Sequence, residues 1–472
     1  MGNQSIQDVV ILGAGISGLA CAHHLKEKAP QLNISILDSA SHTGGVMQTI
    51  KRDGFIIERG PDSWLSEKKE ALELIQKLGL EDELIQTNDV NRRSFILRDK
   101  RLRAVPEGFH MIAPSNLGAF IKSDILSLPG KMRLLAEPFI RAKRDSPDES
   151  IETFIKRRLG SEAYDYIAQP MVGGVYTGDP AQLSTHLLLK RFVDMETKHG
   201  SLIRAMRKNK AASSINQDSG PRYSLFLSLK EGMQSLTDAL EKSFEANTIS
   251  TNTNIESIQF NKKAPHWTID VGNKSIKTNS LVMALPPSAS ANLLENTHSE
   301  LATNLRAVRH ESVVTISMGF RRMQIKHKLN GFGFVVPAKE NSPLIACSFS
   351  SIKFTNRAPY GHVLLRAFVG GPFGKQYFDM NYDELLWLIR KELEGVLGLE
   401  GKPLFIESGR FTNSMPQYVL GHKELVQDIE SSVRGIKSLY FCGNIHNGVG
   451  IPDCIRQAQL AANDLLKEKN NA

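Results

Sequence analysis

The stretch VVILGAGISGLACAHHL, residues 9–25, is the feature that most limits how this chain folds. Its first residues form an apolar run that predicts a buried strand, and a helix is expected from about Ile16. Gly13, Gly15 and Gly18 follow the strand in the spacing G-x-G-x-x-G. The first glycine allows the tight turn, the second lets the backbone approach a pyrophosphate, and the third packs the helix against the strand. The stretch therefore predicts a nucleotide-binding α/β domain.

A carboxylate stands where a ribose would lie in such a domain. Asp38 comes twenty residues after Gly18, at the end of a second predicted strand, Ile34–Leu37. From there it can accept hydrogen bonds from ribose hydroxyls, while the N-terminus of the first helix offers free N–H groups to the phosphates. A glycine turn without a ligand is the alternative, and the agreement of strand, spacing and acid argues against it. The motif alone leaves both NAD and FAD open.

Two further features favour FAD. A second glycine pair, Gly44-Gly45, follows the acid, and DGFIIERGPDSW continues from it as an extended segment. Near the C-terminus, LYFCGNIHNGVGIPDC predicts a strand, a glycine-rich turn and a helix that begins near Pro452. The N-terminus of that helix would direct its positive pole at the flavin N1–C2=O region and stabilise the anionic reduced flavin. A plain NAD dehydrogenase does not need this second helix end.

The order of these patterns predicts an α/β fold in which separated segments build the nucleotide-binding domain. The period of the apolar residues changes from helical to alternating after about residue 222, and helix and strand patterns mix from 301 onward. The predicted organisation is a first FAD-binding segment at 1–90, substrate-domain strands at 91–116, a helical insertion at 117–210 that faces either a membrane or the substrate, a second FAD-binding segment at 222–300, an α+β substrate domain at 301–434, and a third FAD-binding segment at 435–472.

Individual elements can be predicted within these segments. Ser150 or Asp148 is the expected N-cap of a helix that Gly160 ends, and a long amphipathic helix is expected over 382–397. The polar stretch 207–222 lacks apolar anchors and is expected to be a flexible loop. Strands are expected in a meander made of TNTNIESIQF, HWTIDVG and SIKTNSLVMALPP, and near 313–320, 333–336, 345–350 and 363–369.

Composition and charge exclude several classes of protein. The net charge is +8, but the chain has no arginine-rich block, zinc-ligand spacing or RNA-binding aromatic signature, so neither nucleic acid nor a metal is expected. Its four cysteines are scattered and are expected to be reduced and buried. No apolar run is long enough to span a membrane, the start lacks a secretory signal, and MGNQSI has Ile6 where myristoylation requires Ser or Thr. A cytoplasmic protein is expected.

Eight motifs together resemble the oxygen-dependent protoporphyrinogen and coproporphyrinogen oxidases. They are GAGISGLA, TGG, DGFIIERGPDSW, IETFIKRRLG, GGVYTGDPAQLS, ETKHGSL, SMPQYVLGH and NGVGIPDCI, and they run from residue 13 to residue 455, so the resemblance spans nearly the whole chain. The first motif is shared by many flavoproteins, whereas GGVYTGDPAQLS, MPQYVLGH and GVGIPDCI in this order are far more specific. The resemblance implies an amine-oxidase-like FAD fold of the p-hydroxybenzoate-hydroxylase type, with a Rossmann-like FAD/NAD(P)-binding domain.

The resemblance also implies which residues contact noncovalent FAD. Three positions depart from the family pattern. Asp38 replaces the commoner Glu, the HTGG motif lacks the Arg that often precedes the glycines, and Ser94 stands in the register of an arginine that binds a substrate propionate in some members. The implied FAD contacts are Gly13, Ala14, Gly15, Ile16, Ser17, Gly18, Asp38, Ser39, Gly45, Val46, Gly60, Pro61, Asp62, Ser63, Ile255, Asn444, Val449, Gly450 and Ile451.

The implied reaction is the six-electron oxidation of a porphyrinogen to a porphyrin in haem biosynthesis, with oxygen reduced to hydrogen peroxide. Because the hard chemistry belongs to the flavin, no acid–base residue is assigned, and the histidines, including His422, are interpreted as structural. Gly173 and Gly174 are expected to line the substrate, although a plain turn between helices is an alternative. Arg92 and Arg93 are the candidates to bind propionates.

Two rival classes share part of this pattern. An amine oxidase or carotenoid desaturase would have every FAD feature but not GGVYTG together with MPQYVLGH. A flavin-free escort protein on the same fold would not need the intact glycine fingerprint with Asp38. The sequence leaves open which porphyrinogen is preferred, the oligomeric state, inhibitor sensitivity, and whether the protein contacts a membrane or another enzyme of the haem pathway.

Overall fold

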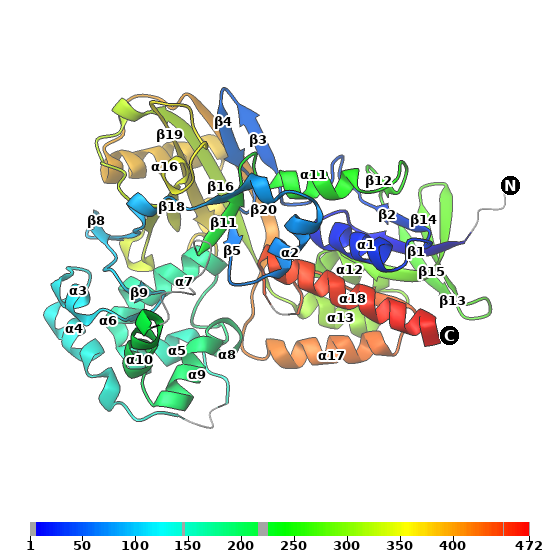
Figure 1. The fold of residues 1–472 in the computed structure, drawn as a ribbon, viewed down its shortest axis with the longest axis horizontal. Helices are drawn as coiled ribbons and strands as arrows, with labels where there is room; N and C mark the ends of the chain where they lie inside the picture. The colour runs from blue at the N-terminus through cyan, green and yellow to red at the C-terminus, as the bar shows by residue number, and fades with distance from the viewer. Residues whose placement is uncertain (1–5, 144–146, 216–224, 447, 472) are drawn as a thin grey trace.

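The computed structural model describes residues 6–143, 147–215, 225–446 and 448–471. Figure 1 shows a dinucleotide-type sheet with its helices on the right, a second sheet at the upper left, and a helical region below that second sheet. The N- and C-terminal ends both lie on the side of the first sheet. Three parts of the chain that are far apart in sequence build this first region, because β1, β15 and β21 all belong to one sheet.

The first sheet has parallel strands at its centre and an antiparallel meander at one edge. β1 (Gln7–Leu12) pairs in parallel with β2 (Ile34–Leu37) and β15 (Lys274–Met283), and β15 pairs in parallel with β21 (Leu439–Phe441). β13 (Ser257–Asn261) and β14 (His266–Val271) form the predicted meander with β15, and β12 (Ile249–Ser250) extends the other edge. The meander's first strand is shorter than predicted, because 251–256 is not a strand.

Helices cover both faces of this sheet. This explains why all of the last four residues of β1 are apolar. Val9 and Ile11 face one layer while Val10 and Leu12 face the other, and all four side chains are buried. The first layer contains α1 (Ile16–Lys28), α2 (Glu70–Lys77), α11 (Gln234–Lys242) and α18 (Ile451–Asn471), and the second contains α12 (Pro287–Leu294), α13 (Ser299–Ala307) and α17 (His422–Arg434).

The second sheet has seven strands and is covered on one face by α16 (Tyr382–Leu397). Its order is β20 (Phe405–Pro416), β16 (His310–Arg321), β19 (His362–Gly370), β18 (Ala346–Phe349), β17 (Gly333–Val335), β7 (Phe95–Arg98) and β8 (Arg101–Ala104). Strands β16 to β19 and helix α16 were expected from the sequence. The edge strand β20 was not, because its sequence FIESGRFTNSMP carries polar residues on both faces.

The helical region lies beneath this sheet in Figure 1. The side chain of Ser150 caps α5 by accepting a hydrogen bond from the Thr153 N–H, and Gly160 ends the helix at a φ of 95°. The predicted loop at 207–222 is wrong over its first part, because 207–215 belong to α10; Lys and Ala favour helix there. Residues 216–222 lie outside the described part of the chain. The helices are α3 (Leu117–Lys122), α4 (Leu128–Leu135), α5 (Ile151–Leu159), α6 (Ser161–Ala163), α7 (Gln169–Tyr176), α8 (Thr185–Leu188), α9 (Lys190–His199) and α10 (Leu202–Ile215).

Short strands form three small sheets of their own, which are β3 (Thr49–Arg52) with β4 (Phe55–Glu58), β11 (Phe226–Leu229) between β5 (Trp64–Leu65) and β6 (Leu84–Gln86), and β9 (Phe109–His110) with β10 (Ala113–Pro114). β4 and β5 lie at the junction between the two large sheets in Figure 1. The remaining short elements are α14 (Ser350–Lys353) and α15 (Lys375–Phe378). The predicted α/β architecture is confirmed. Among the described helices, none combines the length and apolar character that crossing a bilayer requires.

Candidate active site

The glycines of the fingerprint turn are required for two different reasons. A side chain on Gly18 would place its Cβ 1.9 Å from the carbonyl oxygen of Gly13, so this glycine is needed for the protein's own packing. A Cβ on Gly15 would meet no protein atom within 4 Å, so the protein's own packing does not require a glycine there and the space beside it is free for a ligand. Gly15 is the N-cap of α1 and gives no side-chain cap to the helix N–H groups. The turn therefore fits a pyrophosphate.

Asp38 lies at the end of β2 and orders the backbone around it. One carboxylate oxygen accepts the Ala14 N–H at 2.6 Å and the other accepts the Ala40 N–H at 2.8 Å. The main-chain carbonyl of Asp38 accepts the N–H of Thr253 at 2.8 Å, which brings the segment containing Ile255 beside the carboxylate. A carboxylate has acceptor capacity beyond these two bonds, so Asp38 can still bind ribose hydroxyls.

We expect Asp38→Ala to weaken FAD binding by about 1.5–3 kcal/mol, because hydrogen bonds to a charged acceptor are lost. The measurement is titration of the apo-variant with FAD, followed by flavin fluorescence. Asp38→Asn serves as the comparison of similar shape, since it removes the charge and replaces one of the two acceptor oxygens with an NH2 donor. An unchanged affinity in Asp38→Ala would show that the ribose lies elsewhere.

Three loops that were predicted to contact FAD touch one another through their backbones. The N–H of Gly44 donates to the carbonyl of Ala14 at 2.8 Å, which joins the second glycine pair to the fingerprint turn. A Cβ on Gly60 would lie 1.8 Å from the carbonyl oxygen of Val46, so the loop after β4 presses directly on the loop after β2. Residues 13–18, 44–46 and 59–63 therefore form one continuous surface, from which the side chain of Val46 is half exposed.

Two side chains of the SMPQYVLGH motif form hydrogen bonds to the backbone of the loop between β21 and α18. The hydroxyl of Tyr418 donates to the Asn444 carbonyl at 2.7 Å, and His422 Nε2 donates to the Ile445 carbonyl at 3.0 Å. The two rings lie 4.6 Å apart, centroid to centroid, and both side chains are buried. Burial lowers the pKa of His422, so its imidazole is neutral near pH 7. Through this bond His422 supports the loop, and its purely structural role stays a prediction.

The first turn of α18 contains its own carboxylate. Asp453 is almost fully buried, accepts the Gly450 N–H at 3.3 Å and pairs with Lys68 Nζ at 2.5 Å. The positive pole of this helix is thus partly satisfied by Asp453, and Lys68 compensates the added negative charge. The glycine-rich turn and helix start in the sequence predicted neither of these two contacts.

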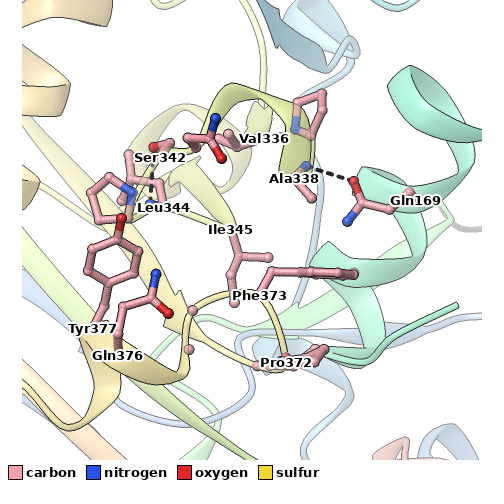
Figure 2. Close-up of a pocket in the computed structure, with 18 of the residues that line it drawn as sticks. Gln169, Val336, Ala338, Ser342, Leu344, Ile345, Pro372, Phe373, Gln376 and Tyr377 are labelled. Atoms are coloured by element: carbon pink, nitrogen blue, oxygen red, sulfur yellow. Dashed lines mark hydrogen bonds between the residues drawn. The ribbon is translucent and has the colours of Figure 1, made fainter. Parts of the chain in front are cut away.

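Gly173 and Gly174 lie inside helix α7. The alternative that they form a plain turn between helices is therefore wrong. Gly173 is buried, whereas Gly174 is exposed, and a Cβ on it would lie 3.0 Å from Val335 Cγ1 on β17. Figure 2 shows α7 facing the turn between β17 and β18, with Gln169 accepting the Ala338 N–H at 2.8 Å. Gly173 is also one of the residues that line the pocket drawn there, as are Phe373 and Ile345. The structure therefore leaves the backbone of α7 accessible at Gly174.

Arg92 and Arg93 both have exposed side chains outside the pocket of Figure 2. A carboxylate oxygen of Asp89 lies 4.0 Å from Arg92, and the carbonyl of Arg93 accepts the N–H of Phe332 at 2.8 Å. Their binding of propionates remains a prediction. Among the described residues, no group of three His, Cys, Asp or Glu side chains is arranged to hold a metal.

Sequence reasoning missed two cations, the largely buried Lys353 at the end of α14 and the buried Arg366 on β19. Lys353 Nζ bonds to both carboxylate oxygens of Asp62, at 3.0 and 3.1 Å, and to Ser63 Oγ at 3.0 Å. Arg366 donates to the carbonyls of Arg59 and Gly60. The available signal was a charged residue inside the apolar run HVLLRAFVG, because an arginine on a buried strand needs a specific partner.

The chain matches the family of flavin-containing amine oxidoreductases over residues 16–466 and belongs to it. Within this family its relatives include porphyrinogen oxidases. It is 32% identical to a coproporphyrinogen III oxidase of Bacillus subtilis, over 97% of both chains. It is 30% identical to one of Staphylococcus aureus, over 98% of this chain and 99% of the other. It is 25% identical to the mitochondrial protoporphyrinogen oxidase of Nicotiana tabacum, over 95% and 92%.

Solved structures agree with this assignment. A crystal structure from Exiguobacterium aligns with a TM-score of 0.88 and 27% identity, over 99% of this chain and all of the other. UDP-galactopyranose mutase aligns with a TM-score of 0.72 and 16% identity, which shows the fold alone. The predicted resemblance, the amine-oxidase-like fold and the flavin cofactor are confirmed, and the protein is an oxidoreductase. With the glycine fingerprint and Asp38, the flavin is FAD.

Proposed function

We propose that this protein oxidises coproporphyrinogen III to coproporphyrin III in haem biosynthesis, with protoporphyrinogen IX as the poorer substrate and oxygen as the electron acceptor. The observation that carries the proposal is the whole-length similarity to coproporphyrinogen III oxidases, which exceeds the similarity to protoporphyrinogen oxidases. The net charge of +8 also suits a substrate with four carboxylates better than one with two. Three oxygen molecules would take up six electrons and yield three of hydrogen peroxide.

In this proposal FAD lies along the surface formed by residues 13–18, 44–46, 59–63, 443–446 and 448–451. When bound, it supplies the acceptor for the electrons that leave the macrocycle. Asp38 and Ser39 would bind the ribose, and the segment at Ile255 would meet the adenine. The further proposed contacts are Gly13 to Gly18, Gly45, Val46, Gly60, Pro61, Asp62, Ser63, Asn444, Val449, Gly450 and Ile451.

The chain's own work in the reaction is to bind and orient the macrocycle. The exposed backbone at Gly174 offers a surface without a side chain, and Val335 stands opposite it. Tyr176, two residues later, is close enough to Asp453 for that carboxylate to raise the pKa of the phenol, after the larger effect of its burial. The end of α7 therefore approaches the first turn of α18, beside the proposed flavin position. We propose that the macrocycle binds beside this end of α7.

Parallel steady-state assays on the two porphyrinogens test the proposal. We expect activity without added NAD(P)H, one hydrogen peroxide per oxygen consumed, and a higher kcat/KM for coproporphyrinogen III. An obligatory nicotinamide would contradict the oxygen-dependent reaction, and a higher kcat/KM for protoporphyrinogen IX would reverse the substrate assignment.

We also propose that the protein is cytoplasmic and touches the membrane surface through its helical region. Leu128 and Met132 lie one turn apart on α4 and are 70% and 57% exposed, and Phe139 shortly after them is 86% exposed. Exposed Lys122 and Arg141 flank these side chains, which suits an anionic lipid surface. The helices α3 and α4 form the far left edge of Figure 1, away from the dinucleotide-type sheet.

A vesicle co-sedimentation experiment tests this contact. We expect the wild type to bind vesicles rich in phosphatidylglycerol and the Leu128→Ser/Phe139→Ser variant to lose most of that binding, because apolar surface no longer enters the bilayer. Trp387→Ser is the matched control, since it removes an exposed apolar side chain on α16. Equal binding by all three proteins, or none by the wild type, would contradict the contact.

A further inference from the structure

The loop Arg59–Ser63 belongs to the dinucleotide-binding part, yet side chains of the second sheet hold it. Arg366 on β19 donates to the carbonyl of Arg59 at 2.8 Å and also to that of Gly60. Thr315 on β16 donates from its hydroxyl to the same Arg59 carbonyl at 3.0 Å. Every one of these bonds ends on backbone, so they fix where the loop runs rather than which side chains it carries.

Lys353 holds the other end of the same loop. Its ammonium lies 3.0 Å from Asp62 Oδ1 and 3.0 Å from Ser63 Oγ, and its side chain is only 14% exposed. Burial alone would raise the pKa of Asp62, but Lys353 and Arg366 outweigh that effect and hold it at about 2. Asp62 is therefore ionised across the physiological range, and the pair persists there.

The bonds of Lys353 and Arg366 differ from ordinary surface ion pairs. Arg366 is 4% exposed, and its guanidinium lies 4.9 Å from the ring centroid of Phe368, so it cannot swing away into solvent. Exposed ion pairs contribute little because water competes for both charges, whereas buried, hydrogen-bonded charges are costly to separate. Loop 59–63 therefore keeps its position only while the second sheet stays in place.

We propose that Lys353 and Arg366 are positioning residues for FAD, which act by fixing loop 59–63 against the substrate-side sheet. FAD retention then depends on a residue of β19 and on one of the adjoining helix α14, and FAD in turn strengthens their attachment to the dinucleotide-binding part, because linkage is reciprocal. The inference rests on the FAD placement proposed above at this loop. It is measured without any porphyrinogen, so its failure is distinguishable from failure of the proposed reaction.

The experiment compares Lys353→Met with a matched control from the same junction. Arg52 on β3 and Glu407 on β20 also join the two parts, at 2.9 Å, but their side chains are 45% and 25% exposed and neither contacts loop 59–63. We expect Lys353→Met to raise the Kd for FAD about tenfold or more, since charge-assisted bonds to the loop are lost. Arg52→Met should change it less than about twofold.

Thermal unfolding separates positioning from a general loss of stability. FAD raises the Tm of the wild type by mass action, and that increment should shrink in Lys353→Met while it is unchanged in Arg52→Met. An equal fall in the Tm of apo- and holoprotein, with the increment intact, would show a merely structural role and overturn the proposal. So would an unchanged Kd.

A second variant keeps the test decisive if Lys353→Met does not fold. Asp62→Asn/Lys353→Met removes both charges of this pair together, so neither of the two is left without its partner. We expect this double variant to fold and to bind FAD about as weakly as the single one, because the attachment of the loop is missing in both. Wild-type affinity in the double variant would mean that only an uncompensated Asp62 charge mattered, and would overturn the proposal.

Discussion

A Gly15→Val variant is expected to fold normally and to lose FAD, with an affinity lower by more than about a hundredfold. The Cβ position meets no protein atom within 4 Å, and the φ of −70° is one that Val adopts, so the apoprotein accommodates the side chain. The same side chain occupies the space that the pyrophosphate needs, which adds a steric cost to the loss of hydrogen bonds from α1. The measurements are flavin content, the Kd for FAD and the Tm of the apoprotein.

Gly18→Ala provides the contrast. Its Cβ would lie 1.9 Å from a backbone oxygen, which cannot move without breaking the turn, so both the fold of the domain and the cofactor should be lost. The two variants thus separate a glycine needed for the ligand from a glycine needed for packing. If Gly15→Val kept wild-type flavin content, the phosphates would have to lie elsewhere than at the start of α1.

Gly174→Val is expected to lower turnover about a hundredfold while FAD content and Tm change little. The new side chain would press on Val335 Cγ1, 3.0 Å from the Cβ position, and would cover the part of α7 that is exposed at this residue. A displacement of the macrocycle by about 1 Å from the reacting position is enough for a loss of this size. The readouts are kcat and KM on both porphyrinogens, flavin content and thermal unfolding.

Gly395→Val is the matched control for this substitution. Gly395 also lies in a helix, α16, and no atom lies within 4 Å of its Cβ position. Helix α16 packs on the second sheet. Gly395→Val should therefore share the cost of a β-branched residue in a helix without affecting turnover. Wild-type turnover in Gly174→Val would place the macrocycle elsewhere, and a parallel loss of FAD would show that the proposed division between the two sites is wrong.

The parts of the fold that sequence could predict are those with local signals. β1, α1 and β2 follow from an apolar run, three glycines and an acid within thirty or so residues, and α16 follows from its helical period. Strand β20 was not predicted, because an edge strand with polar residues on both faces has no alternating pattern. The helix over 207–215 was not predicted, because this stretch lacks apolar anchors, although its Lys and Ala residues favour helix.

The candidate site also contains residues that the sequence indicates and contacts that it does not. The fingerprint turn and Asp38 carry their chemistry in their spacing, so the sequence indicates a dinucleotide site directly. The support that Tyr418 and His422 give to the loop before α18, and the contacts of Lys353 and Arg366 with loop 59–63, join residues that lie far apart in the chain. No local pattern contains such a contact. A buried charge inside an apolar strand indicates that a partner exists, but only the three-dimensional structure identifies it.

The most direct test of the central claim is an anaerobic mixing experiment. The purified, yellow holoprotein is mixed with excess coproporphyrinogen III in the absence of oxygen, and the absorbance of the flavin is followed. Because the proposal makes the bound flavin the first electron acceptor, we expect it to bleach at a rate no slower than kcat and to regain its colour when oxygen is admitted, with coproporphyrin III and hydrogen peroxide as products. A flavin that stays oxidised with coproporphyrinogen III and with protoporphyrinogen IX would contradict the account.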